Sequence, residues 1–290
     1  MTGILLIDKP PEWTSHDVIG KLRGLLRLRR IGHAGTLDPM ATGLLTVFVG
    51  RATRGVEFAE AQEKTYIARL RLGVTTDTQD TTGRVLETSD RKVPREELEA
   101  ILPQFCGEIF QVPPMYSAIK IDGQRLYKLA RQGVEVERKA RPVTIHKLEL
   151  LGEVEDGFDL EITCSKGTYI RTLCHDIGQT LGSGGAMAAL RRTQVGAFSI
   201  ADAHTLEELQ AAENRAQFLQ PLDTLFVSYP PITVDKRQEQ GIRNGQTVRI
   251  SEHLPGRVRV YGQSGEFLAF GEVKTGPTLV TIKSFFDPAH

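Results

Sequence analysis

The sequence of 290 residues predicts an α+β fold, with a mixed, mainly antiparallel sheet flanked by helices and a small β module at the C-terminus. Apolar alternation over 64–73 and a strand pair around the Asp-Gly turn at 156–157 are typical of antiparallel sheet. After a proline-rich segment at 228–231, short strands alternate with glycine turns. We therefore expect one domain over 1–228 and a second over 229–290.

The N-terminal part begins with a short buried strand over 3–8, which a Lys-Pro-Pro sequence ends. Thr14 or Ser15 can then cap a helix over 17–30, because its apolar residues recur on one face. The apolar run 44–49 predicts a second buried strand.

In the middle of the chain, start and stop signals define further elements. The polar, turn-rich segment 75–83 is expected to be an exposed loop with a structural role. A proline and three glutamates near the start of 94–102 favour a helix, and Thr168 can cap another that runs to Leu181. The other expected elements are helices at 52–61, 125–131 and 205–212, the last opened by a capping box, and strands at 142–151, 158–164, 232–234, 247–250, 258–261, 267–270 and 279–282.

Composition excludes several classes of protein. The content of 40% hydrophobic and 25% charged residues is typical of a globular protein. Because the formal net charge is zero, the chain as a whole has no positive potential that would attract a polyanion. Cations nevertheless gather in two clusters, over 21–30 and over 125–141. Either alone could be a solvated surface, whereas two clusters beside one site would form a groove that follows phosphates.

Familiar catalytic and targeting motifs are missing. The three cysteines form no C-x-x-C pair and the histidines lack ligand spacing, so neither disulfides nor a metal site is expected. P-loop, H-E-x-x-H and G-x-S-x-G sequences do not occur, and Met187 occupies the place of the last glycine in a dinucleotide fingerprint. Without a signal peptide or a span of ~20 apolar residues, the protein is expected to be cytoplasmic, with no membrane partner.

Several unusual features occur together in residues 32–45, which have the sequence G-H-A-G-T-L-D-P-M-A-T-G-L-L. Asp38 lies between glycines and a proline, just ahead of the buried strand, so its carboxylate belongs to a constrained loop. A lone Asp-Pro is most often a turn. A phosphoaspartate enzyme of the haloacid type would place a second Asp where Met40 stands.

The stretch resembles the catalytic-aspartate motif of the TruB family, the bacterial tRNA pseudouridine-55 synthases, across G-H-x-G-T-L-D-P-x-A-x-G-L-L. Similar matches occur along the chain: K-T-Y at 64–66, P-P-x-Y-S-A-x-K at 113–120 before a basic helix, S-K-G-T-Y-I-R at 165–171 and L-R-R-T at 190–193. The family more often has bulkier residues where this chain has Met187 and Ala188.

The resemblance implies a pseudouridine synthase fold with a compact PUA-like, RNA-binding barrel at 229–290. It also implies isomerisation of uridine 55 in the T-loop of tRNA, in which the N1–C1′ bond breaks and the ring rejoins through C5. Asp38 would be the nucleophile, at C1′ or at C6, and no cofactor or metal would be needed. Extruding the base costs a few kcal/mol, of which an aromatic platform recovers ~1–3 kcal/mol. That platform would be Tyr66. Full activity of Tyr66→Phe would restrict this residue to stacking, whereas a loss would assign its hydroxyl to proton removal.

Other residues acquire expected roles from the same resemblance. His33 would contact RNA near the extruded nucleotide, while Tyr169 and Leu190 would line the base pocket. An insertion at about 111–141 would grip the T-arm. The candidates for contact with the RNA backbone are Lys9, Arg30, Lys120, Arg125, Lys128 and Arg131. Taken alone, Tyr66 would more often be a core aromatic and His33 a structural histidine. Core packing is also the alternative for Tyr169 and, equally with a pocket role, for Leu190.

Arg171 is singled out by physical chemistry. It lies in the first turn of an expected helix, where a cation opposes the helix dipole. This position suggests a specific anionic partner, for which Asp38 is the candidate. A guanidinium within ~4–6 Å would counter the rise in pKa that burial imposes on a carboxyl group.

Three functions are compatible with the sequence. The first is a stand-alone monomeric enzyme that acts on the tRNA T-arm without an obligate protein partner. The second is an RNA-binding or RNA-folding protein without catalysis. The third is an RNA-guided synthase that needs protein partners, against which residues 111–133 argue because they would grip RNA directly.

Overall fold

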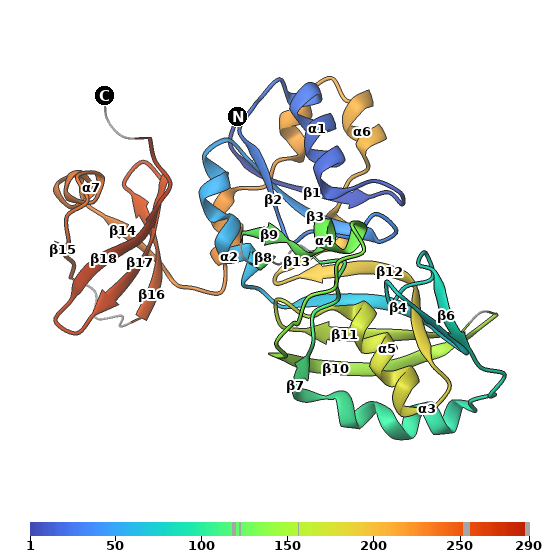
Figure 1. The fold of residues 1–290 in the computed structure, drawn as a ribbon. Helices are drawn as coiled ribbons and strands as arrows, with labels where there is room; N and C mark the ends of the chain where they lie inside the picture. Colours follow the sequence, from blue (N-terminus) through green and yellow to red (C-terminus); the bar gives the residue numbers. More distant parts are fainter. Residues whose placement is uncertain (118–119, 122, 156, 252–255, 288–290) are drawn as a thin grey trace.

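The computed structural model describes all residues except 118–119, 122, 156, 252–255 and 288–290; the side chains of Lys120, Ile121, Arg125, Tyr127, Lys128 and Arg131 are also outside the description. A sheet in the order β1-β3-β12-β4-β11-β10-β7, with β2 on β3 and β13 on β12, forms the framework (Figure 1). Its strands are β1 (Gly3–Lys9), β2 (Ile31–Ala34), β3 (Thr42–Val49), β4 (Lys64–Leu72), β7 (Gly107–Gln111), β10 (Arg141–Val154), β11 (Gly157–Cys164), β12 (Gly185–Val195) and β13 (Phe198–Ser199). The pairs are antiparallel except for β12 with β3, which confirms the mixed, mainly antiparallel sheet.

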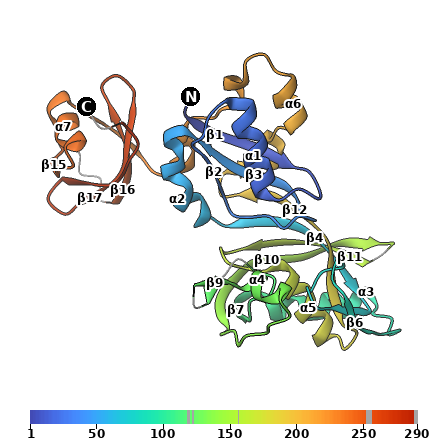
Figure 2. The same ribbon diagram turned by 45° about the horizontal axis from the view of Figure 1, so that its top comes forward.

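The two halves of this sheet are buried differently. β1 and β3 are covered on both faces, because Leu5 packs in one core cluster and its neighbour Leu6 in another. Helices α1 (Ser15–Leu26) and α6 (Leu206–Ala211) lie side by side over one of these faces (Figures 1 and 2). A strand buried on both faces has an uninterrupted apolar sequence, as β1 and β3 do.

The other half has one covered face. Along β4, Tyr66, Ala68 and Leu70 are buried while the residues between them are partly exposed. Their face packs against α5 (Ile170–Thr180) and α3 (Arg95–Ile101). The alternation that predicted this strand therefore reflects a sheet with one solvated face.

Capping and turn residues in the sequence predicted where most helices begin and end, and the structure corrects some of these boundaries. α1 begins after Thr14, which forms a capping box with Asp17, but Arg27 adopts the left-handed conformation and ends the helix well before residue 30. Thr168 is not a cap: its hydroxyl donates to the carbonyl of Ser165, and Tyr169 is the N-cap of α5. Two of the expected helices are partly 3₁₀ turns. The segment expected as a helix at 52–61 forms η1 (Gly50–Gly55) and then α2 (Val56–Glu60), and the one at 94–102 forms α3 and then η2 (Leu102–Phe105).

Between β7 and β10 the chain forms the insertion, with β8 (Lys120–Ile121) paired to β9 (Gln124–Arg125) and α4 (Leu126–Arg131). A second small hairpin, β5 (Val74–Thr76) with β6 (Val85–Thr88), follows β4. Remaining 3₁₀ turns are η3 (Ile200–Asp202), η4 (Arg215–Phe218) and η5 (Leu222–Phe226).

The C-terminal strands form a separate sheet in the order β14-β16-β17-β18-β15. Its elements are β14 (Pro231–Val234), α7 (Lys236–Arg243), β15 (Val248–Arg249), β16 (Gly256–Gly262), β17 (Phe267–Lys274) and β18 (Thr278–Ser284). The strands match the expected β module, whereas α7 was not predicted, although Asp235 and Gln238 form a capping box at its start. This sheet lies beside η1 and α2, which gives the molecule an elongated outline (Figure 1).

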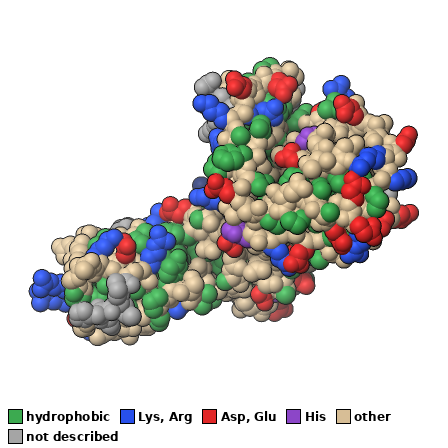
Figure 3. Space-filling model, turned by 90° about the horizontal axis from the view of Figure 1, so that it is seen from below, with side chains coloured by type: hydrophobic (Ala, Val, Ile, Leu, Met, Phe, Trp, Pro, Cys, Tyr) green, Lys and Arg blue, Asp and Glu red, His purple; other side chains and the backbone are tan. Residues whose placement is uncertain are grey.

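Two further features bear on function. Over the described part of the chain, no helix combines the length and apolarity that crossing a membrane requires. The face in Figure 3 carries basic and acidic side chains interspersed, in keeping with a net charge of zero.

Candidate active site

Asp38 lies on the loop between β2 and β3, and core packing and hydrogen bonds hold that loop in place. Leu37 is buried in the core, and its backbone N–H donates to the hydroxyl of Ser15 over 2.9 Å. The N–H of Ala41 donates to the carbonyl of Asp38 over 3.0 Å, which closes a turn around the proline. The carboxylate thus projects from a rigid turn, with 39% of the side chain exposed.

Arg171 contacts this carboxylate from α5. Its Nε lies 3.0 Å from Oδ2 of Asp38 and its Nη2 lies 3.5 Å from Oδ1, while the arginine side chain is only 6% exposed. The two residues expected to pair are therefore in contact, with the guanidinium buried and the carboxylate facing out. Two N–H groups from one planar guanidinium define the orientation of a carboxylate.

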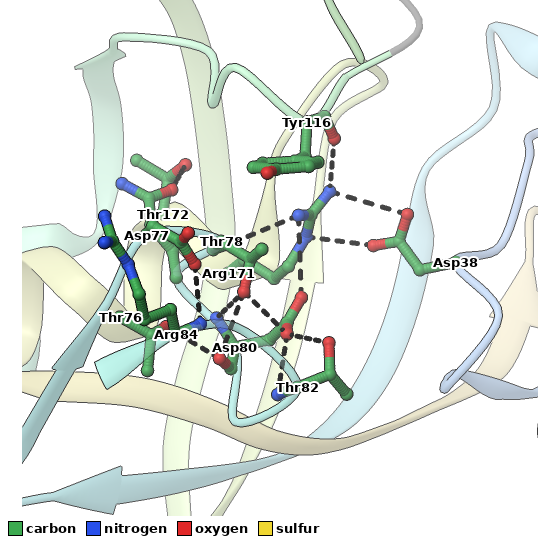
Figure 4. Close-up of polar contacts among 11 residues, drawn as sticks. Asp38, Thr76, Asp77, Thr78, Asp80, Thr82, Arg84, Tyr116, Arg171 and Thr172 are labelled. Carbon is green, nitrogen blue, oxygen red and sulfur yellow. Dashed lines mark hydrogen bonds and ion pairs between the residues drawn. The ribbon is translucent and has the colours of Figure 1, made fainter. Parts of the chain in front are cut away.

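A second carboxylate lies on the other side of Arg171. Nη1 of Arg171 is 3.6 Å from Oδ2 of Asp80, whose side chain is 7% exposed (Figure 4). Arg171 also donates to the carbonyls of Thr78, over 3.1 Å, and Tyr116, over 2.8 Å. Asp80 itself accepts hydrogen bonds from Thr82, through both its N–H and its hydroxyl, and from the hydroxyl of Thr78.

The segment 75–83 is therefore not the exposed loop that its polarity suggested. Thr75, Thr76 and Asp80 are buried, and backbone hydrogen bonds join Gln79 and Thr81 to Met187 of β12. Sequence reasoning missed Asp80. The available signal was an acid flanked by threonines, whose hydroxyl groups can satisfy a buried carboxylate.

The charge balance around Asp38 follows from these contacts. Burial raises the pKa of Asp38 above its ordinary value, the Arg171 guanidinium opposes that rise, and the nearby Asp80 charge adds to it. Arg171 thus keeps the carboxylate more acidic than burial alone would allow, while the net direction is upward.

Aromatic and apolar side chains form the wall beside the loop. Tyr66 on β4 and Leu190 on β12 are 9% and 8% exposed, and both belong to the core cluster that contains Leu37 and Ala41. Tyr169 is half-buried, and its backbone N–H and carbonyl are both bonded to the side chain of Gln111. Burial raises the pKa of Tyr66 and of Tyr169, which keeps both phenols neutral at neutral pH.

His33 lies on β2, before the Asp38 loop. Its ring packs edge-on against His16, with 5.6 Å between ring centroids. Burial lowers its pKa to about 4, so the ring is neutral at physiological pH. Its Nδ1 is buried and has no partner among the described residues. The ring is therefore suited to stacking or to a single hydrogen bond rather than to ion pairing.

Comparison with known proteins gives the family. Models of three family segments match consecutive parts of the chain: TruB family pseudouridylate synthase (N terminal domain) over 23–170, tRNA pseudouridylate synthase B C-terminal domain over 171–227, and Pseudouridine synthase II TruB, C-terminal over 230–280. The chain belongs to the TruB family. It is accordingly a pseudouridine synthase, an isomerase.

Curated relatives in the TruB family extend over almost the whole chain. The tRNA pseudouridine synthase B of Pseudomonas fluorescens is 47% identical over 280 residues, covering 94% of this chain and 92% of the relative. That of Clostridium kluyveri is 42% identical over 276 residues, covering 93% and 95%. Among solved structures, a chain in the crystal structure of a Cbf5-Nop10-Gar1 complex is 26% identical with a TM-score of 0.75, covering 99% of this chain and 85% of that one. The pseudouridine synthase fold with a PUA-like C-terminal barrel is thereby confirmed.

The TruB-family residues expected to touch the RNA backbone lie in different settings. Arg30 is exposed and donates to the hydroxyl of Thr53 over 2.9 Å. The side chains of the candidates in the insertion lie outside the described residues, namely Lys120, Arg125, Lys128 and Arg131.

Lys9 requires a correction. It is fully buried, and its Nζ donates to the carbonyls of Pro10, Trp13 and Pro39. All three ammonium protons are thereby used, so the side chain offers no donor to a phosphate in this position. Burial lowers its pKa to about 8, and the Asp38 charge opposes the decrease. Lys9 instead fastens the residue after Asp38 to the end of β1.

The arrangement suits nucleophilic chemistry. Asp38 is accessible and oriented, and neutral phenols and an apolar wall adjoin it. Among the described residues, no three His, Cys, Asp or Glu side chains are grouped to hold a metal ion.

Proposed function

We propose that this chain converts uridine 55 in the T-loop of tRNA to pseudouridine, acting alone and without a cofactor, with Asp38 as the nucleophile. Relatives named tRNA pseudouridine synthase B support tRNA as the substrate. The observation that carries the proposal is the contact between an accessible Asp38 carboxylate and the buried Arg171 guanidinium.

The chemistry needs what these residues provide. Isomerisation breaks the N1–C1′ bond and forms a bond between C5 and C1′, so the product has the same atoms as the substrate and no electrons are exchanged with a cofactor. A carboxylate held ionised can attack C1′ or C6, provided that the reacting atoms approach to about 3–3.5 Å. Arg171 supports both requirements, since it fixes the direction of the carboxylate and counters the rise in its pKa.

The extruded base needs a pocket beside that carboxylate. Tyr66 offers an aromatic face for stacking, and Tyr169 and Leu190 complete the wall. We assign RNA contact near the flipped nucleotide to His33, grip on the T-arm to the insertion at 111–141, and additional RNA binding to residues 229–290. We expect the enzyme to be a monomer, with residues 1–228 as its catalytic domain.

The test is an assay of the purified chain with an unmodified T-arm hairpin tritiated at C5 of uridine, because pseudouridine formation releases that hydrogen. We expect release by the wild-type chain and none by Asp38→Asn, whose Kd for the hairpin stays within about threefold of the wild-type value. A hairpin with cytidine at position 55 should give no product. Product from Asp38→Asn, or from the cytidine hairpin, would contradict the assignment.

An RNA-guided enzyme is the second candidate, favoured by the likeness to a chain in a Cbf5-Nop10-Gar1 complex. The same assay separates the two. A stand-alone enzyme acts on the hairpin without added protein or guide RNA, whereas a guided enzyme is inactive until they are supplied. A protein that binds the hairpin yet never forms product would be a tRNA-binding protein without catalysis.

A further inference from the structure

Arg192 on β12 is a buried cation that the proposed reaction leaves without a role. It is 1% exposed and stands opposite Tyr66 in the antiparallel pair of β12 with β4, so the two side chains share one face of the sheet. Its Nε donates to the carbonyl of Leu44 over 2.7 Å, and its Nη2 donates to the carbonyl of Gly35 over 2.9 Å. These two carbonyls lie on either side of the loop that carries Asp38.

The contact with the loop is close. A Cβ atom added to Gly35 would lie 3.2 Å from Nη1 of Arg192, and Gly35 has a φ of +70°. A glycine at this position therefore lets the backbone pass directly over the guanidinium. One side chain of β12 thus holds the start and the end of the Asp38 loop, and β12 itself pairs with the strand that carries Tyr66.

The guanidinium of Arg192 donates to two neutral carbonyls, those of Leu44 and Gly35, and no carboxylate forms an ion pair with it in the described part of the chain. Burying a guanidinium without a counter-ion costs free energy, which a purely structural tie could avoid with a neutral donor. The charge therefore points to a role in the site.

Tyr66 is the polar group on which that charge acts. The ionisable groups that face it are Arg192 from β12, Cys164 from β11 and Asp38 from the loop. Burial raises the pKa of Tyr66, and the positive charge of Arg192, opposite it on the neighbouring strand, lowers that pKa. Removing the charge should therefore make the phenol harder to ionise.

We propose that Arg192 is a positioning residue for pseudouridine formation: it ties both ends of the Asp38 loop to β12 and sets its positive charge opposite Tyr66, so that the carboxylate and the phenol keep their places around the substrate base. The inference rests on the proposed function, because it assigns the base pocket to Tyr66. It adds a specific consequence for tyrosine ionisation that can be measured without substrate.

The first experiment is a pH titration of the free enzyme labelled with ¹³C at the tyrosine ring, with the Tyr66 resonance assigned by its loss in Tyr66→Phe. We expect the pKa of Tyr66 to rise in Arg192→Gln relative to wild type, and to be unchanged in Arg191→Gln. Arg191 is the matched control, because it is next in sequence but pairs with Asp8 over 2.7 Å and is 42% exposed. An unchanged Tyr66 titration in folded Arg192→Gln would overturn the proposal.

The second experiment measures single-turnover rate and Kd with the T-arm hairpin. Arg192→Gln is expected to lose about 10²-fold in rate, the cost of a small misplacement of reacting groups, while Kd stays within about threefold. Arg191→Gln should match wild type in both quantities. In the Tyr66→Phe background the further loss from Arg192→Gln should shrink, since part of its effect passes through the phenol.

Arg192→Lys keeps the test valid if the glutamine variant does not fold. A single ammonium retains the charge but cannot span both carbonyls as the planar guanidinium does. We expect a folded protein with a Tyr66 pKa near the wild-type value and a reduced rate, and a wild-type rate in this variant would contradict the loop tie. If the wild-type chain formed no pseudouridine while the Tyr66 titration still responded to Arg192, the proposed function would fail and the coupling of the two residues would stand.

Discussion

At the scale of single residues, one guanidinium serves two carboxylates. Arg171 contacts Asp38, which is partly exposed, and Asp80, which is buried, so the three groups together carry one unit of negative charge. That excess, added to burial, explains why the pKa of Asp38 is raised although an arginine lies 3.0 Å away. Asp80, satisfied by Thr78 and Thr82, then acts chiefly to hold the guanidinium in place.

This charge balance predicts how stability depends on pH. With a pKa of Asp38 above its unfolded value, the folded protein binds that proton more tightly, so stability is lost as the pH rises through the folded pKa. We expect Asp38→Asn to raise Tm at pH 8, and the gain to disappear below about pH 4, where the unfolded carboxyl is protonated as well. Scanning calorimetry at several pH values measures both.

The control is Asp90→Asn, which changes an exposed aspartate and is expected to shift stability by no more than about 0.5 kcal/mol at any pH. A decrease in Tm for Asp38→Asn at pH 8 would mean that the ion pair with Arg171 outweighs burial, opposite to the direction argued above.

The residues of the site were predictable to different degrees. Arg171 could be paired with Asp38 from the sequence, because a cation in the first turn of a helix needs a local reason. Asp80 could not be found this way, since its burial depends on hydrogen bonds between 79–81 and Met187, more than 100 residues later in the sequence. Lys9 was misplaced for a similar reason, because the carbonyl of Pro39 that fixes it belongs to another segment.

At the scale of elements, the site depends on one parallel contact in an otherwise antiparallel sheet. β12 meets β3 at Gly43, opposite Arg192, immediately after the Asp38 loop. Gly43 has a φ of +97°, and a Cβ atom there would lie 2.3 Å from the carbonyl oxygen and 2.8 Å from the nitrogen of Arg192. Only glycine allows the two strands to approach this closely.

We therefore predict that Gly43→Ala destabilises the protein by about 2–5 kcal/mol, because backbone strain and overpacking add at this point. Activity should fall as well, since the strand that begins there fixes the Asp38 loop. Urea unfolding and the tritium-release assay measure the two effects. Gly20→Ala is the control: Gly20 lies within α1 with no atom within 4 Å of an added Cβ, so a gain of about 0.5–1 kcal/mol is expected. Similar changes in both variants would show that the close approach at Gly43 is unimportant.

The helices and strands that were predicted correctly are those with the strongest local sequence signals, namely caps and apolar alternation. The cap at Thr14, the capping box of α6 and the alternation of β4 correctly predicted the start of α1 and the presence of α6 and β4. The short amphipathic helix α7 was overlooked within a segment dominated by strand and turn signals, and the ends of α1 and α5 were set by backbone geometry that composition does not specify.

At the scale of the whole molecule, the C-terminal sheet is docked firmly against the rest. Phe270 of β17 is 1% exposed and stacks on Phe226, with 4.4 Å between ring centroids. Phe58 and Tyr229 meet the same ring edge-on. Arg54 donates to the carbonyls of Ser284 and Phe286, which adds polar contacts at the edge of the aromatic cluster. An interface with a packed aromatic centre resists hinge motion more than a polar one does.

This packing predicts cooperative unfolding of the two sheets. Truncating a buried phenylalanine costs about 3–5 kcal/mol, and here the loss falls on the contact between the sheets. We expect one calorimetric transition for the wild-type chain and two separated transitions for Phe270→Ala. Arg51→Ala is the control, because Arg51 forms only partly exposed ion pairs with Glu266 and Asp287, and such pairs contribute about 0–1 kcal/mol. If Phe270→Ala kept a single transition at the wild-type Tm, the aromatic cluster would not be what joins the sheets, and other contacts across the interface, such as the hydrogen bonds of Arg54, would have to couple them.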